Sequence, residues 1–109
     1  MDNPKLLSLL GMARRAGKLC CGHDGAVGAI RKKSAKLCIL SSDSSERLRK
    51  EISREAAYEG RDIPVVTMEA DMQLLGHATG LKSAVITVND EGFANAMLKL
   101  VNTEKEVNA

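Results

Sequence analysis

The segment that decides the fold is GHDGAVGAIRKKSAKLCILSSDSS, residues 22–45. It reads as a helix, an apolar strand and the start of a second helix, with glycine or small polar residues before each helix. The first amides of such helices have no partner within the helix and carry a partial positive charge, so they can hold phosphate. Between the two helix starts lies the densest cluster of cations in the chain: Arg31, Lys32, Lys33 and Lys36. The segment therefore predicts an edge of the molecule that faces phosphate groups.

Helices and strands alternate outward from this segment. The patterns predict helices over 3–15, 24–33, 43–60, 67–76 and 90–101, and strands over 18–21, 36–40, 63–66 and 84–88. Asp24, Asp43 and Thr67 are expected to cap helices, and Asp43 with Glu46 matches a capping box. We therefore predict an α/β protein, a three-layer α-β-α sandwich around a four-stranded mixed sheet that is mainly parallel. Strand direction, and with it the junctions that share one edge, stays open.

The length and the aromatic content narrow the class of protein. A chain of 109 residues is expected to form a single domain, here residues 1–101, followed by a polar tail, 102–109, that frays. Tyr58 and Phe93 are the only aromatic residues. A protein that stacks single-stranded bases on several exposed rings is therefore excluded. If the chain binds nucleic acid, it does so through cations, backbone amides and aliphatic contacts.

Charge is distributed unevenly along the chain. Residues 1–40 contain eight Lys or Arg and two Asp or Glu, whereas residues 41–109 contain eight and twelve. This asymmetry predicts a basic face built by the first helices and an acidic face elsewhere. The alternative is that both groups of charges belong to ordinary solvated helix surfaces.

The cysteines and the apolar stretches point to a cytoplasmic protein without cofactors. Cys20, Cys21 and Cys38 are odd in number and contain no CxxC pair, so we interpret them as reduced residues, with a redox role for Cys20 and Cys21 as the alternative. The apolar stretch 6–13 has helical spacing and is interrupted by Arg14, which favours a core-facing helix over a signal peptide. No stretch approaches the roughly 18 apolar residues that span a bilayer. We expect no metal, no small-molecule cofactor and no membrane contact.

A second candidate segment is LGHATGL, residues 75–81. It is expected to leave a helix through Gly76 and to reach the next strand past Gly80, so that two glycines bracket a loop. Glycines permit a left-handed backbone and the close approach of a partner. The alternative is that both glycines simply end a helix and form a turn.

Four motifs in this order resemble the kink-turn RNA-binding ribosomal-protein superfamily, whose best known members are the large-subunit proteins seven-Ae and thirty-e. They are Gly22-x-Asp24 at a helix start, 35–43 with the strand and its Ser41-x-Asp43 end, Ile63-Pro64-Val65, and Leu75-Gly76-x-Ala78-x-Gly80. The ending Asp90-x-Gly92-Phe93-Ala94-Asn95 looks most like a short bacterial member. The resemblance covers about residues 5–101. It implies an α-β-α sandwich that grips sharply bent RNA and has no catalytic activity.

The resemblance also implies which residues touch RNA. In the family, a glycine-x-Asn-Glu-x-x-Lys helix start enters the RNA groove; here Gly22 matches, while Asp24, Gly25 and Gly28 replace the asparagine, the acidic residue and the lysine. Loss of that lysine removes a guanine-edge contact worth roughly 1–3 kcal/mol, for which Arg31 and Lys32 are expected to compensate through phosphate. The expected RNA-binding residues are Lys18, Gly22, His23, Asp24, Gly25, Arg31, Lys32, Lys33, Lys36, Gly76, His77, Ala78, Thr79 and Gly80. The expected partners are kink-turn or ribosomal RNA and a ribosome or ribonucleoprotein, contacted by a monomer.

Two other functions stay open at this point. An enzyme is disfavoured, because His23 and Asp24 are sequence neighbours that rarely align to activate a thiol such as Cys20, and no nucleotide or zinc motif is present. A protein-interaction module on the same fold, with weak generic affinity for RNA, is the main alternative. Its face would be the acidic residues Glu51, Glu55, Glu59 and Asp62, which otherwise form a solvated helix exterior.

Overall fold

The computed structural model describes the backbone of residues 4–108 and the side chains of residues 4–101. The elements follow one another as α1 (Pro4–Arg15), β1 (Leu19–Cys21), α2 (His23–Arg31), β2 (Leu37–Leu40), α3 (Glu46–Ala57), a 3₁₀ turn (Tyr58–Gly60), β3 (Val65–Thr67), α4 (Met72–Thr79), β4 (Val85–Val88) and α5 (Glu91–Asn108). The helices and strands expected from the sequence are all present in this order. Helix α5 continues into the segment that the sequence predicts as a polar tail, and the fraying of that tail stays a prediction.

The four strands form one mixed sheet in the order β1-β4-β2-β3. Strand β4 lies in the middle and runs antiparallel to both β1 and β2, while β2 and β3 are parallel. The prediction of a mixed sheet is confirmed. Strands β1, β2 and β3 run in the same direction, but two of the three strand pairings are antiparallel, so the sheet is not mainly parallel as expected. Strand β4 is apolar and fully buried, so it gains most by inserting at the centre, where both of its edges find partners.

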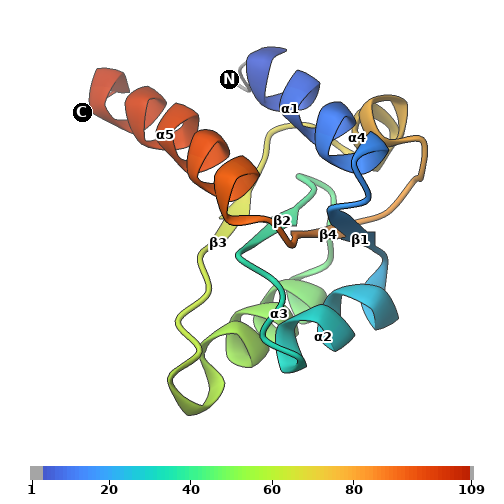
Figure 1. The fold of residues 1–109 in the computed structure, drawn as a ribbon, viewed down its shortest axis with the longest axis vertical. Coiled ribbons are helices and arrows are strands. Elements are labelled where there is room, and N and C mark those ends of the chain that lie inside the picture. Colours follow the sequence, from blue (N-terminus) through green and yellow to red (C-terminus); the bar gives the residue numbers. More distant parts are fainter. Residues whose placement is uncertain (1–3, 109) are drawn as a thin grey trace.

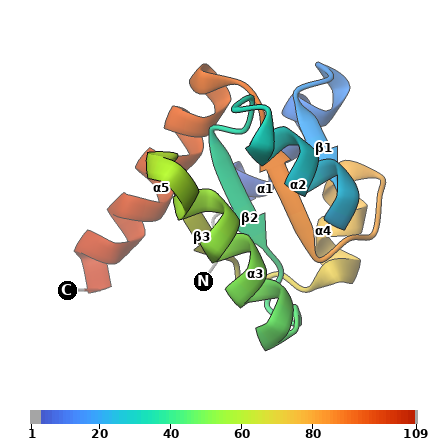
Figure 2. The ribbon, with the colours of Figure 1, turned by 90° about the horizontal axis from the view of Figure 1, so that it is seen from below.

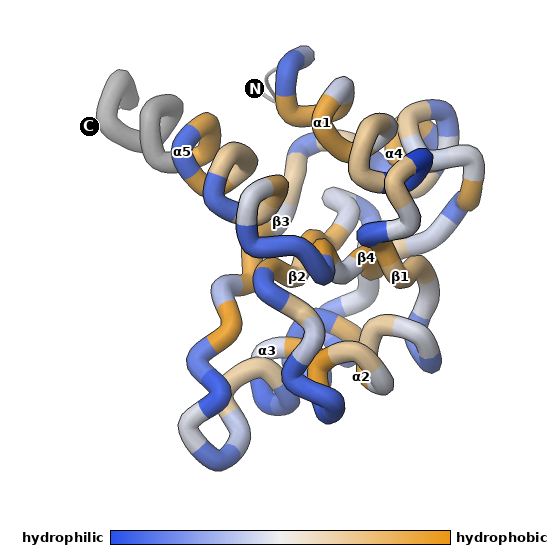
Figure 3. The backbone as a smooth tube through the Cα atoms, viewed as in Figure 1, coloured by the Kyte–Doolittle hydropathy of each residue, from blue (hydrophilic) through white to orange (hydrophobic). Residues whose placement is uncertain are grey.

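Helices cover both faces of this sheet (Figures 1 and 2). Helices α2 and α3 cover one face, where Ile30, Cys38 and Ile52 belong to one buried cluster. Helices α1, α4 and α5 cover the other, where Leu10 and Met97 belong to a second cluster. Figure 3 shows hydrophobic residues gathered in the strands between these layers. The three-layer sandwich predicted from the sequence is therefore confirmed.

Several helix starts differ from the predicted caps. Helix α3 is capped by Ser45, whose Oγ accepts from the Leu48 amide at 3.1 Å, and not by an Asp43–Glu46 box. Helix α4 is capped by Asp71, whose carboxylate accepts from the Leu74 amide, and not by Thr67. Asp43 instead accepts from the Met72 amide and thereby joins the end of β2 to the start of α4. Capping depends on a side chain that reaches its own N3 amide, and sequence patterns place it to within a few residues.

The strand directions create two opposite edges of the sheet. Strands β1, β2 and β3 end where β4 begins, because Leu40 pairs with Val85 and Cys21 with Ile86. We name this the α2-start edge, since the junctions that lead into α2, α3, α4 and β4 all lie there. The α2-end edge is opposite, where the Lys36 amide donates to Val88 and the Asn89 amide donates to Lys18. Helix α2 runs from one edge to the other.

Candidate functional site

The start of α2 presents backbone amides that no side chain caps. Gly22 precedes the helix with φ 88° and ψ 165°, a conformation that glycine alone adopts readily. Its N–H donates to Val85 of the central strand, and its carbonyl accepts from Ala26, the first amide bonded along the helix. Because Gly22 has no side chain, nothing from that position covers the amides of the first turn. A helix starts here as predicted, but the expectation that Asp24 caps it is wrong, because Gly22 is the N-cap and Asp24 lies inside the first turn.

His23 lies between two carboxylates at this helix start. Its Nε2 is 2.6 Å from Glu51 of α3, and its Nδ1 is 3.1 Å from Asp24. Hydrogen bonds to Glu51 first and to Asp24 second raise the pKa of His23 above its ordinary value. The Asp24 side chain is otherwise fully exposed. The ring therefore fastens the start of α2 to α3 most firmly when it is protonated.

The second predicted segment is helical, which corrects the expected loop. Helix α4 continues through Gly76, His77 and Ala78 to Thr79, and only Gly80 ends it, with a left-handed φ of 83°. A Cβ on Gly76 would lie 3.3 Å from the Cα of Lys82, so this glycine allows the following loop to pack on the helix. Thr79 is buried and donates its hydroxyl to Leu75, so its side chain positions the helix end and offers nothing to a partner.

The end of α4 and the start of α2 lie at the same edge of the sheet. Arg14 of α1 donates from Nε to the Thr79 carbonyl at 3.1 Å, and its charge also acts on the thiol of Cys21, which directly precedes Gly22. The loop that follows Gly80 leads into β4, whose first residue Val85 accepts from Gly22. The α2-start edge therefore combines the Gly22–Gly25 segment with the end of α4, a point that the sequence left open.

The cations in the predicted site lie elsewhere. Lys18 precedes β1, Lys36 precedes β2, and Arg31 ends α2, so all three belong to the α2-end edge. Lys32 and Lys33 follow Arg31 in the same turn. The nine residues of α2 separate the two groups by about 12 Å. The expectation that these cations flank the helix start is wrong, because an element that spans the sheet carries its two ends to opposite edges.

Three residues of the α2-start edge, Arg14, Leu81 and Lys82, are missing from the site predicted from the sequence. Arg14 holds the end of α4, as described above. Lys82 and the neighbouring Leu81 lie in the loop after Gly80 and are exposed. The signal for Lys82 was its position directly after a helix-ending glycine, and for Arg14 it was its place in the last turn of an amphipathic helix.

The residues considered for catalysis are not assembled. The Cys20 sulfur accepts from the Asn89 amide group at 3.2 Å, and both ring nitrogens of His23 face carboxylates. Burial raises the pKa of the Cys21 thiol, which disfavours the thiolate. Among the described side chains, no three His, Cys, Asp or Glu residues gather as a metal site. No helix within residues 4–108 is long and apolar enough to cross a membrane.

Two of the four acidic residues considered as a protein-binding face, Glu51 and Glu55, are engaged within the molecule. Glu51 bonds His23, and Glu55 accepts from Arg31 at 2.7 Å and from Arg61 at 3.3 Å. The Arg31 guanidinium beside Glu55 holds the pKa of that carboxyl below its ordinary value. These carboxylates hold α2, α3 and the turn after α3 together.

Comparisons with known proteins point in one direction. A model of the ribosomal protein L7Ae/L30e/S12e/Gadd45 family matches residues 4–98. The chain is 32% identical over 103 residues to RNA-binding protein YlxQ of Bacillus subtilis, covering 94% of this chain and 100% of that protein. It is 28% identical over 100 residues to RNA-binding protein YlxQ of Enterococcus faecium, covering 92% of this chain and 94% of that protein.

Two solved structures share the fold. A Bacillus halodurans protein of unknown function superposes with a TM-score of 0.84 at 35% identity, covering 92% of this chain and 99% of that one. The 15.5 kD RNA-binding protein of Giardia lamblia superposes with a TM-score of 0.70 at 18% identity, covering 94% of this chain and 90% of that one. The sandwich built here around β4 is thus a recurrent arrangement.

Proposed function

This chain belongs to the ribosomal protein L7Ae/L30e/S12e/Gadd45 family, and from that premise we propose that it binds kinked or otherwise structured RNA through the α2-start edge. The observation that carries the proposal is the uncapped start of α2 at Gly22, at the same edge of the sheet as the loop that follows α4. Backbone amides at a helix start bind phosphate oxygens and base-edge acceptors. A kink in duplex RNA exposes base edges that a regular A-form groove hides.

The end of α4 supplies the second half of this surface. Leu81 is 44% exposed at the loop that leaves α4, and Lys82 lies next to it. An aliphatic side chain can pack on an unstacked base, while a lysine neutralises a phosphate. The names of the YlxQ relatives, which describe RNA-binding proteins, support the same proposal.

The residues at the start of α2 predict that the protein discriminates weakly between RNA sequences. Asp24, Gly25 and Gly28 stand where the family pattern has an asparagine, an acidic residue and a lysine. The structure leaves room for the family residues, since a Cβ on Gly28 meets nothing within 4 Å and one on Gly25 makes an ordinary contact of 3.6 Å with Cys20. Recognition by this chain therefore rests more on phosphates and RNA shape than on base edges.

We propose that this RNA-binding role is non-catalytic and is carried out by a monomer in the cytoplasm, on kink-turn or ribosomal RNA within a ribosome or ribonucleoprotein. The membership of ribosomal proteins in this family supports the choice of RNA. The engaged ring nitrogens of His23 and the disfavoured thiolate of Cys21 support a role without catalysis.

The test is a binding titration against a kink-turn RNA and a straight duplex of equal length, at two salt concentrations. Tenfold or greater preference for the kinked RNA, about 1.4 kcal/mol, that survives the higher salt is the expected result. Equal and salt-labile binding to both RNAs would remove kink recognition and leave a generic basic surface.

Gly28→Lys sharpens this test. Restoring the lysine of the family pattern should raise affinity for the kinked RNA about tenfold, within the roughly 1–3 kcal/mol of a bidentate base contact. Gly28→Ala is the matched control, because it gives the same gain in helix propensity without the charge. An equal gain for the straight duplex would show that the new lysine acts only as a phosphate contact.

A further inference from the structure

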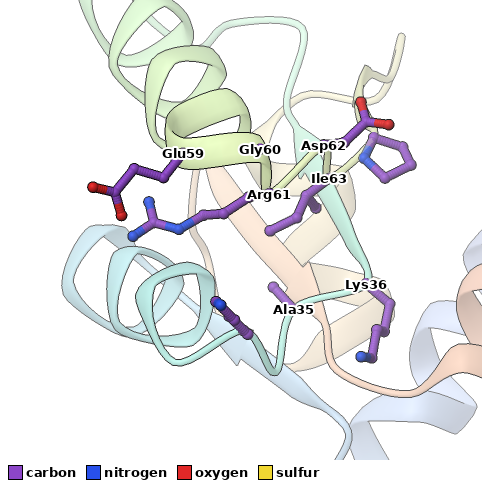
Figure 4. Close-up of a pocket in the computed structure, with 9 residues that line it drawn as sticks. Ala35, Lys36, Glu59, Gly60, Arg61, Asp62 and Ile63 are labelled. Atoms are coloured by element: carbon purple, nitrogen blue, oxygen red, sulfur yellow. The ribbon is translucent and has the colours of Figure 1, made fainter.

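A pocket opens at the α2-end edge, far from the surface proposed above (Figure 4). Its volume is about 350 Å³, and two turns line it: Lys33, Ala35 and Lys36 between α2 and β2, and residues 59–64 between α3 and β3. Figure 4 shows both turns bordering one hollow. Lys33 and Lys36 bring cations to it from one turn, while Arg61 of the facing turn has a side chain that is only 12% exposed and is held by Glu55.

Three residues that line this pocket have backbone conformations that are unfavourable for residues other than glycine. Among the described residues, Lys33, Glu59 and Asp62 are the non-glycine residues with positive φ, at 63°, 53° and 51°, and all three line this pocket. Lys33 follows the end of α2, at the position where glycine is the common choice. Side chains kept in left-handed conformations cluster at functional sites. Lys33 therefore occupies a left-handed position that glycine would adopt at lower cost, and it brings a positive charge to the pocket.

The charge of the surroundings favours a polyanion. The ends of α2 and α3 and the turns after them carry six cations: Arg31, Lys32, Lys33, Lys36, Arg54 and Arg61. The same segments carry three acidic residues: Glu55, Glu59 and Asp62. The Glu55 carboxylate accepts hydrogen bonds from two arginines, Arg31 and Arg61. No ion pair involving Lys32, Lys33 or Lys36 is found within the described part of the chain. The helix dipole accounts for cations at the end of α2, but not for Lys36 or for the strained turn across the pocket.

We propose that this pocket is a second RNA-binding surface, at which Lys33 and Lys36 hold the phosphate backbone of a different RNA segment from the one at the α2-start edge. The inference rests on the proposed function for the identity of the polyanion. The two surfaces lie at opposite ends of α2, about 12 Å apart along the helix, so they hold different phosphates. We place the phosphates at the pocket on a second arm, so that the protein joins two arms of a folded RNA.

The experiment uses Lys33→Gly combined with Lys36→Gln, and two RNAs. One RNA has only the kinked site, and the other carries an additional helical arm. The double variant is expected to bind the two-armed RNA about fivefold more weakly and to reduce the slope of log affinity against log salt by about 1.5, the value for two phosphate contacts. Its affinity for the short RNA is expected to stay unchanged.

Stability separates a functional lysine from a structural one. Lys33→Gly alone should raise Tm by about 4 °C, because glycine relieves the left-handed backbone, while it weakens binding of the two-armed RNA. Glu59→Gly is the matched control, since it relieves the facing turn and keeps every cation, so it should raise Tm without loss of affinity. Lys50→Gln, on the exposed side of α3, controls for the loss of one positive charge.

The outcomes discriminate between the two proposals. A wild-type protein that binds both RNAs equally well, with affinities unchanged in the double variant, would overturn the second surface and leave the α2-start edge intact. A wild-type protein that binds neither RNA would overturn both proposals.

Discussion

At the residue scale, Gly22 does two things that no other residue type can do together. Its φ of 88° and ψ of 165° turn the chain sharply from β1 into α2. Its missing side chain leaves the first amides of the helix open to a partner. A side chain at this position would strain the backbone by about 1–3 kcal/mol and cover the site. The fold and the proposed function therefore both require that residue 22 has no side chain.

His23 supplies a prediction of pH dependence. Because Glu51 and Asp24 raise its pKa in the folded state, the histidine stabilises the fold fully below its unfolded pKa of about 6.5, and the stabilisation disappears as pH rises through the folded pKa. An NMR titration of the His23 ring should therefore show a midpoint above 6.5. Glu51→Gln should move that midpoint down, since it removes the largest cause of the shift.

The same pair has a consequence for stability. The difference in unfolding free energy between the wild type and Glu51→Gln should be larger near pH 6 than near pH 8. Glu46→Gln, on the same helix but paired with Lys50, is the control and should leave the His23 midpoint in place. Identical His23 midpoints in the wild type and Glu51→Gln would contradict the contact.

At the element scale, α1 and α4 approach each other through a glycine. A Cβ on Gly11 would lie 3.0 Å from the carbonyl oxygen of Ala78, an atom of the backbone that cannot turn away. This close packing holds the end of α4, together with the bond from Arg14 to Thr79. The geometry of the α2-start edge therefore depends in part on the packing of α1 against α4.

Gly11→Ala tests this packing. Overpacking should cost about 1–3 kcal/mol, and the gain in helix propensity should offset about 0.5–1 kcal/mol of it. We expect a net loss of roughly 1 kcal/mol in urea unfolding. Gly28→Ala has the same propensity gain with nothing within 4 Å of its Cβ, so it should stabilise instead. Stabilisation by both variants would show that α1 and α4 can move apart freely.

Helix α2 joins the two proposed surfaces. Its start carries open amides and its end carries Arg31 and the cations of the following turn. Its buried residues Ala26, Val27, Ala29 and Ile30 hold it against the sheet between them. The orientation of one surface relative to the other is therefore set by a rigid element, as a protein that joins two RNA arms requires.

At the scale of the whole molecule, the reactivity of the three cysteine thiols shows whether the protein unfolds in one cooperative step. Cys38 is fully buried on the central strand β2, and desolvation raises its pKa to about 12. Only the thiolate reacts with common thiol reagents, so Cys38 should be modified only when the molecule unfolds as a whole. Cys20 and Cys21 are partly exposed and should react earlier.

The measurement is thiol labelling at pH 8, with the reaction followed with and without urea. We expect two faster thiols and one whose rate follows global unfolding, whereas all three react at once in denaturant. Cys38→Ala should remove the slow phase alone. A single fast phase for all three thiols under native conditions would mean that the layer of α2 and α3 opens away from the sheet and exposes Cys38 without unfolding of the whole molecule.

Particular residues show how much of the fold could be predicted from the sequence. The apolar runs of β2 and β4, the spacing of α1 and the glycine at 22 predict elements that the structure contains, because each depends on residues close together in the chain. Motif order also indicated the family. The caps at Ser45 and Asp71 were each placed a few residues away, and α4 was ended at Gly76, because a glycine in a helix can serve loop packing as well as termination.

The sequence by itself determined the elements, their order and the family, whereas it placed a cap at Asp24 on the helix start that the structure leaves open at Gly22. The tertiary structure alone decided that β4 inserts antiparallel between β1 and β2, since strand pairing depends on contacts between distant residues. That insertion gathers the junctions into one edge and leaves Lys18, Lys33 and Lys36 at the other. The division of one predicted site into two surfaces follows from the sheet, because a helix that crosses it separates residues that are neighbours in sequence.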